Sequence, residues 1–446
     1  MRKYKLILAL GLGMIFCLGG YAQDTLRLDF RQAVELGLQA NLDYRIQENN
    51  MEVLKKEKQV ALMSHLPSIG LSSNFSQLKG QQSQLVEDQI VVTNVTNKTV
   101  SANLNVSVPV FNSGRRILDT QSANLAFQAG SKGMERARQQ VIFDVAQRYL
   151  QVLLDQELLR ISDENLQNQK EVLRQIEGFV DAGLRTVSDL YNQQSEVARV
   201  ESVKVDAEIA LENDLWLLAE YLQLEVGVIP VLEAVNTNSG TREFQDYELS
   251  ELFEIAEMNR SDKAQQQLLK TSYKKDMQAI KAMYFPRISA FYNYNSYYTS
   301  LVEETFQNQF WEIYPQNVLG VGLTIPIFTN FQTRLDVARA KAVYNNQILQ
   351  EKSIDRKVFQ EVKLAQQNYQ AAVRKEFNSQ VQVKAATEAK NAIQERFRLG
   401  LSNFVDLATA NQQFVASQAD QAQAVYTLFF QDVLMKYALG TLDLAL

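Results

Sequence analysis

The chain has 446 residues, with 45 lysines and arginines against 51 aspartates and glutamates and a formal net charge of −6. No basic stripe or tail stands out, so nucleic acid is not an expected partner. The single cysteine, Cys17, excludes a disulfide framework within the chain.

The first 22 residues have the pattern of a secretory signal peptide. A short basic segment precedes an apolar stretch from Leu6 to Leu18, which is too short to span a bilayer comfortably. Small residues at positions 20 and 22 place the expected cleavage site (residues 1–22) before Gln23, with an uncleaved anchor as the alternative. Cleavage would remove Cys17 and leave 42 basic against 51 acidic residues, a net charge of −9.

Two helices and two strands are predicted next. Residues 29–66 read as a short amphipathic helix followed by a more polar one, which Pro67 ends. Residues 99–110 alternate apolar and polar side chains with a period of two, and residues 68–79 do so more weakly. We expect a strand in each, joined by a polar connection over 80–98 that is too long for a tight hairpin.

Strands of this length suit a membrane better than a soluble sheet. About a dozen residues at ~3.3 Å each give a strand of roughly 40 Å, which crosses a hydrocarbon layer when tilted. Strands in soluble sheets usually have ~5–6 residues. A soluble β structure is the alternative, but membrane-spanning strands are the favoured interpretation.

The helices that follow are unusually long. Residues 114–177 contain no proline and predict one continuous helix, roughly 100 Å long at about 1.5 Å per residue. Such a length indicates a coiled coil. Apolar residues recur at coiled-coil spacing in this helix and in its counterpart in the second half: Val145, Val152, Leu159, Leu166 and Leu173, then Val358, Val362, Ala365, Tyr369 and Ala372.

The chain is an internal duplication, a feature that decides the fold. Four prolines and two glycine-led turns recur at spacings of 217 to 219 residues: Pro67 with Pro286, Pro109 with Pro326, and Gly183 with Gly400. We predict a first repeat over 23–230, a linker or equatorial segment over 231–247 and a second repeat over 248–446. The second repeat is expected to hold strands at 288–300 and 317–328.

Each repeat thus supplies two membrane-competent strands and one long helical hairpin. Four strands are too few to close a membrane barrel, since the smallest have eight, and open strand edges are not tolerated in lipid. Several copies must therefore share one barrel, and the simplest closed ring is cyclic. Three copies would supply twelve strands.

Taken in order, these motifs resemble the TolC-type outer-membrane efflux protein family over essentially the whole mature chain. The matching features are the duplicated plan, the proline before the first strand of each half, both glycine-led turns, and the segments Pro109–Arg115, Pro326–Phe328 and Ala438–Leu442. The resemblance implies a mainly α fold with membrane β structure. In that fold a homotrimer shares a twelve-stranded β-barrel, which continues as a periplasmic α-helical coiled-coil tunnel.

The resemblance also implies a function. It is the outer-membrane exit channel of a tripartite efflux pump or a type I-like secretion system, a passive conduit for small molecules or polypeptides. The expected partners are outer-membrane lipid, a periplasmic adaptor (membrane fusion) protein and an inner-membrane transporter. The cell outer membrane is the expected location, with the tunnel extending into the periplasm, and no cofactor is implied.

The glycine-led turns are the first candidate site. Asp406 and Asp189 lie in the first turn of a return helix, where capping alone would explain them. In a trimer they would form carboxylate rings around a narrowing pore, which bias ion passage. We predict that both line the closed periplasmic entrance and that Arg185 pairs across neighbouring hairpins to hold it shut. Asn192 and Thr409 stand where some relatives carry a further acid, so fewer charges are expected here.

The same turns resemble the family's contact site for the adaptor, with a solvated turn as the alternative. The predicted contact residues are Gly183, Leu184, Arg185, Thr186, Gly400, Leu401 and Ser402. Pro109, Gly114 and Pro326 mark the turns that leave the barrel. Phe331 stands where the family usually has glycine, which predicts a different second turn.

Aromatic residues around the second strand pair form a second candidate. Tyr297, Tyr298, Trp311 and Tyr314 suit a girdle at the outer membrane interface, with ordinary loop packing as the alternative.

Little in the sequence supports an enzyme. His65 is the only histidine, beside a predicted helix end where packing or capping is expected, and no Cys/His cluster suggests a metal site. The alternative function is a coiled-coil structural fibre or surface adhesin without a pore. The two matching strand pairs argue against it.

Overall fold

The computed structural model describes residues 26–86, 88–235 and 244–444, so the predicted signal peptide and part of the predicted linker lie outside the described residues. The chain forms two compact units. Unit 1 contains the residues up to Gln47, Glu135–Arg260 and the residues from Lys357 on. Unit 2 contains Glu48–Met134 and Ser261–Arg356. Each unit therefore draws on both halves of the duplicated sequence.

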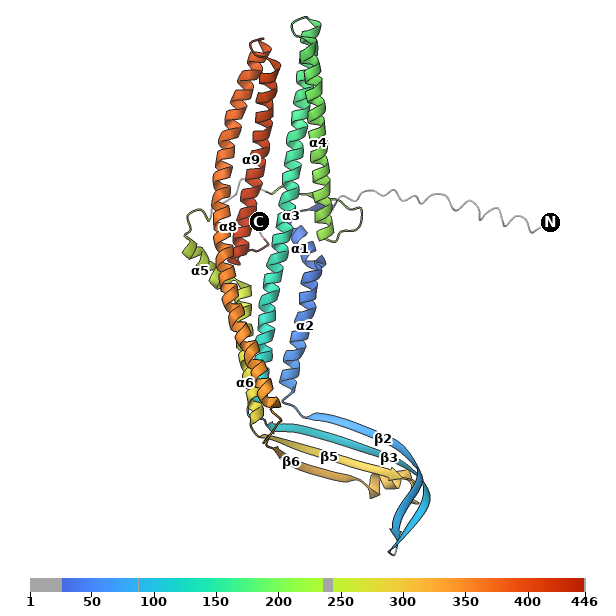
Figure 1. Cartoon of the computed structure of the whole chain (residues 1–446). Helices are drawn as coiled ribbons and strands as arrows, with labels where there is room; N and C mark the ends of the chain where they lie inside the picture. Colours follow the sequence, from blue (N-terminus) through green and yellow to red (C-terminus); the bar gives the residue numbers. More distant parts are fainter. Residues whose placement is uncertain (1–25, 87, 236–243, 445–446) are drawn as a thin grey trace, which may run out of the picture. The chain divides into compact units, whose positions relative to one another are not determined.

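Four long helices make up almost half of the chain (Figure 1). In the first half α3 (Arg115–Asp181) has 67 residues and α4 (Val187–Tyr221) has 35. In the second half α8 (Gln332–Arg398) has 67 and α9 (Phe404–Leu439) has 36. These near-equal lengths confirm the predicted duplication. None of the described helices is both long enough and apolar enough to cross a membrane.

The apolar stripes predicted for a coiled coil are buried inside unit 1. All five stripe residues of α8, from Val358 to Ala372, are at most 3% exposed. On α3, Val145, Val152 and Leu166 are equally buried, whereas the other two stripe residues are half-buried. Isolated helices are only marginally stable in water. Burial of these stripes against neighbouring helices is therefore what stabilises helices of this length.

Shorter helices precede each strand pair in the same order. They are α1 (Phe30–Ala40) and α2 (Leu42–Met63) in the first half, and α5 (Leu249–Asn259), α6 (Ser261–Lys281) and the single turn η2 (Ala282–Tyr284) in the second. Arg260 joins α5 to α6 with its side chain fully buried. Its Nη1 donates to Glu361 Oε2 at 2.6 Å and to the Ala438 carbonyl at 3.1 Å. A buried guanidinium needs such partners because desolvation is costly.

Unit 1 also contains a two-stranded parallel sheet that the sequence analysis did not predict. β1 (Leu26–Leu28) pairs with β4 (Pro230–Leu232), so the segment predicted as a linker begins inside this sheet. Tyr149 of α3 is buried, and its hydroxyl lies 3.1 Å and 2.7 Å from the carbonyl oxygens of Leu28 and Glu233. The tyrosine therefore ties α3 to both strands.

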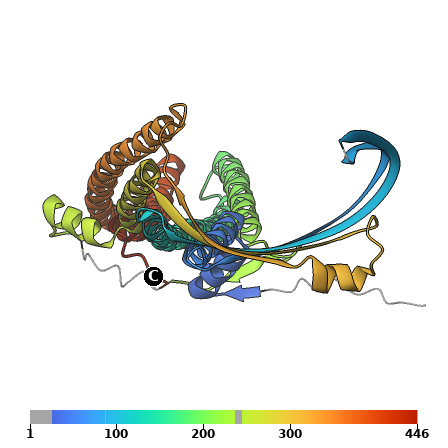
Figure 2. The ribbon, with the colours of Figure 1, turned by 90° about the horizontal axis from the view of Figure 1, so that it is seen from below.

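Unit 2 is built on an antiparallel sheet in the order β2–β3–β5–β6. Its strands are β2 (Ser68–Val86), β3 (Gln89–Phe111), β5 (Arg287–Thr299) and β6 (Gln316–Thr324). The connection predicted over 80–98 is wrong, because pairing continues to Val86 and Gln89 in a hairpin whose far end curls (Figure 2). Strand pairing depends on backbone hydrogen bonds, which polar and exposed side chains leave intact. The polar residues between 80 and 98 therefore continue the two strands. β6 is shorter than predicted and ends at Thr324.

The sheet has one apolar face and one polar face. The strand register places Leu71 and Tyr294 on either side of Leu104, all on the apolar face. The polar face carries two cross-strand amide pairs, in which Asn103 donates to Asn295 and Asn105 donates to Asn293. Cross-strand pairs of this kind stabilise a sheet. They also satisfy the hydrogen-bonding groups of these side-chain amides, which would be costly to place on the apolar face.

The two strand-to-helix exits share a backbone conformation but differ in length. Ser113 and Gly114 have φ of 56° and 76°, and Asn330 and Phe331 have 48° and 59°. Phe331 thus adopts the left-handed conformation without being glycine, at a cost of roughly 1–2 kcal/mol. The second exit was predicted to differ from the first, and it does so in the length of the connection between strand and helix. β3 ends four residues before α3 (Phe111 to Arg115), whereas β6 ends eight residues before α8 (Thr324 to Gln332).

The β5–β6 connection is packed around aromatic rings. It contains α7 (Phe306–Asn308) and the π-turn η3 (Gln309–Ile313). Tyr297 stacks on Tyr314 with ring centroids 4.1 Å apart, which agrees with the loop-packing alternative for these two residues. Trp311 is 58% exposed and stays a candidate for an interface girdle.

A pair of carboxyl groups lies between α3 and α4, with Asp155 buried and Asp214 half-buried. Asp155 is 6% exposed and interacts with Asp214, while Gln151 Nε2 donates to Asp155 Oδ1 at 3.2 Å. Burial, followed by the hydrogen bond and negative charge of Asp214, raises the pKa of Asp155 from 3.8 to about 7. Because the folded-state pKa is the higher one, Asp155 stabilises the fold fully below pH 3.8. This contribution is lost as the pH rises through about 7.

We therefore expect Asp155→Asn to reduce the loss of thermal stability between pH 5 and pH 8. The amide cannot ionise, so the variant should unfold at a temperature higher than the wild type at pH 8, by on the order of a few degrees. Circular dichroism of the detergent-solubilised protein measures this. Asp206→Asn, an exposed position on α4, should leave the pH dependence unchanged. Equal pH dependence in wild type and Asp155→Asn would contradict the assignment.

Candidate functional site

Both long hairpins of unit 1 turn through the same hydrogen-bonded motif. Gly183 and Gly400 have φ of 70° and 74°, a conformation that strongly favours glycine. The amide of Leu184 donates to the Phe179 carbonyl and the amide of Leu401 to that of Arg396, both at 2.8 Å. These bonds close α3 and α8 as Schellman motifs. The recurring Gly-Leu pair therefore has a structural cause in both halves.

The two predicted gate aspartates take part in capping the return helices. Thr186 is the N-cap of α4 and forms a reciprocal capping box with Asp189. Asn403 is the N-cap of α9 and accepts from the Asp406 amide at 2.8 Å, while the Ser402 hydroxyl donates to Asp406 Oδ2 at 2.9 Å. The capping role is thus present for both aspartates. It leaves the Asp406 side chain exposed.

Arg185 joins the two turns within one chain. Its Nη2 donates to the Phe397 carbonyl at 2.6 Å, and its guanidinium lies 4.1 Å from the centre of the Phe397 ring. Arg185 is predicted to pair across neighbouring hairpins, and in this chain it contacts the second hairpin of the same chain. Phe397 packs with Ile176 and Leu407 in a small buried cluster beneath this contact. We call the Arg185–Phe397 contact the tip latch.

Apolar side chains lie exposed around the latch. Leu184 is 71% exposed and Leu401 66%, and Val187 and Val405 on the first turns of α4 and α9 are also exposed. Large apolar residues on the turns of a helical hairpin are not needed for its own packing. They form a surface suited to a partner.

A buried amide network lies further along the same helices and was missed by the sequence analysis. Gln193 Nε2 donates to the Gln169 carbonyl and side chain at 3.0 Å and 2.9 Å. Asn165 Oδ1 accepts from Asn411 at 3.1 Å and more weakly from Gln169. All four residues are at most 8% exposed. Only the packing of α3, α4 and α9 shows that these four amides lie inside.

His65 in unit 2 lies 3.1 Å from the Thr120 hydroxyl, a polar contact between α2's end and α3. Within the part of the chain that the structure describes, no group of three or more His, Cys, Asp or Glu side chains is placed to hold a metal ion.

A duplicated chain of paired strands and long helical hairpins, with a two-faced sheet, defines the class of outer-membrane channel proteins. The outer membrane efflux protein family matches residues 33–222 and 252–435, and the chain belongs to this family. It is accordingly a transport protein of the outer membrane that extends into the periplasm, and not an enzyme.

Named relatives and solved structures agree with this assignment. The outer membrane protein TolC of Vibrio cholerae is 23% identical over 386 residues, which cover 85% of this chain and 83% of that protein. TolC of Escherichia coli K12 is 21% identical over 388 residues, covering 85% and 75%. The structure of CusC, a transmembrane channel, superposes with a TM-score of 0.78 at 16% identity over 93% of both chains. The outer membrane protein VceC of Vibrio cholerae gives a TM-score of 0.75 at 14% identity over 92% of this chain and 96% of that chain.

Proposed function

We propose that three copies of this chain share one twelve-stranded barrel and act as a passive exit channel for an efflux pump or a secretion system. The observation that carries the proposal is the sheet of unit 2. Among the described residues, β2 and β6 each pair on one side only, and one face of the sheet is apolar. Unpaired backbone groups cannot be left in lipid. The edges of one copy are therefore expected to pair with those of the next.

An unpartnered helix face supports association of the same kind. None of the residues of α2 is buried. Ile46, Val53 and Val60 recur every seven residues and are 54%, 56% and 69% exposed. This spacing is that of a coiled-coil seam without its partner helix. A second copy of this chain, arranged around the same axis as the barrel, would cover it.

The family also supports partners at the other membrane. A passive channel needs an engine elsewhere, so we propose that an inner-membrane transporter drives export and that a periplasmic adaptor protein links it to this chain. Both partners are inferred from the family and from the exposed apolar turns around the tip latch. The alternative, a fibre or adhesin without a pore, shares the long helices but has no use for an apolar sheet face.

The purified protein should form a detergent-stable trimer and conduct ions in a planar bilayer. Val53→Glu combined with Val60→Glu should lower the trimer yield severely, because charges would be buried in the seam. Lys55→Glu, an exposed charge reversal elsewhere on α2, should not. Light scattering and single-channel recording measure both properties. A wild-type monomer, or a trimer that conducts nothing, would refute the channel.

We further propose that Asp406 and Asp189 form carboxylate rings at the periplasmic entrance, and that the tip latch helps to keep the entrance closed. The proposal is supported by the exposed Asp406 side chain and by the position of both aspartates beside turns that Arg185 holds together. In a trimer each carboxylate would occur three times around one axis.

Replacing both aspartates with asparagine should lower the preference for cations. Asparagine still accepts hydrogen bonds at a helix N-terminus, so the caps should be kept while the charge is lost. The reversal potential across a salt gradient measures the effect. Glu212→Gln, an exposed change on α4, serves as the control. Unchanged selectivity in the double variant would remove the aspartates from the pore.

The same turns are proposed as the adaptor-docking surface, through Gly183, Leu184, Arg185, Thr186, Gly400, Leu401 and Ser402. A photo-crosslinking residue in place of Leu184 or Leu401 should therefore capture the adaptor protein. The same residue at Val205, an exposed position well inside α4, should not. Capture from Val205 alone would contradict docking at the tips.

A further inference from the structure

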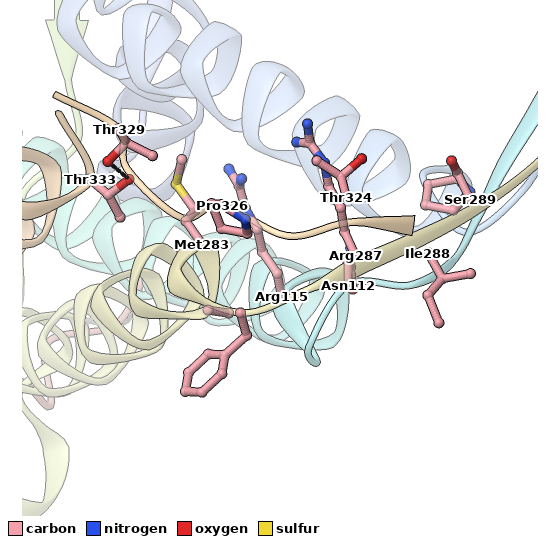
Figure 3. Close-up of a pocket in the computed structure, with 13 residues that line it drawn as sticks. Asn112, Arg115, Met283, Arg287, Ile288, Ser289, Thr324, Pro326, Thr329 and Thr333 are labelled. Carbon is pink, nitrogen blue, oxygen red and sulfur yellow. Dashed lines mark hydrogen bonds between the residues drawn. The ribbon is translucent and has the colours of Figure 1, made fainter. Parts of the chain in front are cut away.

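A cavity of about 370 Å³ opens in unit 2 where the strands meet the helices (Figure 3). It lies beside the long second exit, between the end of β6 at Thr324 and the start of α8. Its other walls come from the start of α3 at Arg115 and the start of β5 at Arg287. This volume is within the range of ~300–1,000 Å³ typical of small-molecule sites.

The cavity carries positive charge in a chain whose net charge is negative. Arg115 and Arg287 both line it, and none of the lining residues that the structure describes is acidic. The Arg287 side chain makes no hydrogen bond or ion pair with the residues that the structure describes. Arg115 has only a half-exposed contact with Asp119 at 3.5 Å. In Figure 3 both guanidinium groups rise on the same side of the strand that ends at Thr324. Guanidinium groups in such a position favour a carboxylate, sulfonate or phosphate.

The duplicated architecture does not require either arginine. At the offset of 217 residues that relates Pro109 to Pro326, the counterpart of Arg115 is Gln332. At the offset of 219 that relates Pro67 to Pro286, the counterpart of Arg287 is Ser68. The prolines that shape the exits recur in both halves, whereas the charges do not. The positive charge is therefore a property of this cavity and not of the turns.

The register of the sheet gives the cavity its orientation. Arg287 pairs with Thr324 and shares its face with Ser289, Asn293 and Asn295, which is the polar face. The other lining residues are uncharged, and they include an apolar group with Met283, Phe285 and Pro326 beside several threonines. A ligand would thus meet cationic groups on the water-facing side and an apolar surface beside them.

We infer that this cavity binds an anionic amphiphile, a molecule with one acidic group and a compact apolar body, on its way along the polar face of the sheet. The inference rests on the proposed channel, because it takes the polar face to line the lumen. Anionic amphiphiles would then be a class of cargo that binds to this chain itself. A phospholipid headgroup has the same chemistry, but it would reach the cavity from the membrane and would not be cargo.

The test uses the trimer in phosphatidylcholine nanodiscs and two dyes that share their rings. Anilinonaphthalene sulfonate is anionic, and N-phenylnaphthylamine is its neutral counterpart. Arg115→Gln with Arg287→Ser, the residues of the duplicate half, should weaken binding of the sulfonate by about tenfold per arginine. Binding of the neutral dye should not change, and Arg334→Gln, an exposed arginine outside the cavity, should affect neither. Arg287→Ser alone serves if the double variant does not assemble.

Three outcomes would overturn the inference. The arginine variants could bind the sulfonate as the wild type does, or they could lose both dyes equally, which would indicate collapse of the cavity. Phosphatidylglycerol added to the discs could displace the sulfonate, which would assign the cavity to lipid. Single-channel conductance separates these from failure of the channel itself. If the wild type conducts while the dye results are negative, only the binding site falls.

Discussion

The sheet in unit 2 has two edges without a partner strand among the described residues, and these edges govern how the chain can assemble. Four strands with an apolar face bury their own backbone groups only in the middle of the sheet. In lipid the outer strands need partners, and the cost of leaving each backbone group unsatisfied is several kcal/mol. Association of identical chains removes the edges without any new element. The exposed heptad stripe of α2 also calls for a partner, since the residues that the structure describes leave it uncovered.

The hairpin turns show how capping and function can use the same residues. Asp189 and Asp406 satisfy the first turn of a helix, yet they are also the acids that a ring at an entrance would use. The tip latch, unlike the two aspartates, is not duplicated, because the residue equivalent to Arg185 in the second turn is Ser402. One arginine per chain therefore joins two hairpins through a carbonyl and a ring. A contact without a buried ion pair avoids much of the desolvation cost that would make opening difficult.

The two halves of the duplicated chain share their backbone geometry but differ in many side chains. Both exits use two left-handed residues, and α3 and α8 both have 67 residues, but several charged groups occur in one copy only. Arg260 lies at the junction of α5 and α6, where the first half has Asn41 between α1 and α2. Arg115 and Arg287 likewise lack charged counterparts. Backbone geometry is set by turns and periodicity, which both copies must share, whereas each buried or cavity-lining charge depends on one local set of neighbours.

The sequence was enough to predict the order of the long helices and of the four strands of unit 2, the duplication, the coiled-coil stripes and the family, because periodicity, prolines and glycine-led turns act over a few residues. It misjudged residues 80–98, since polar side chains describe exposure and not backbone pairing. Other features are visible only in the folded structure. They are the pairing of β1 with β4, the burial of Arg260 and of the amide network, the contact of Arg185 with Phe397, and the arginine-lined cavity. Each of these joins segments far apart in the chain, and no local pattern records which of many polar residues will meet when helices and strands pack.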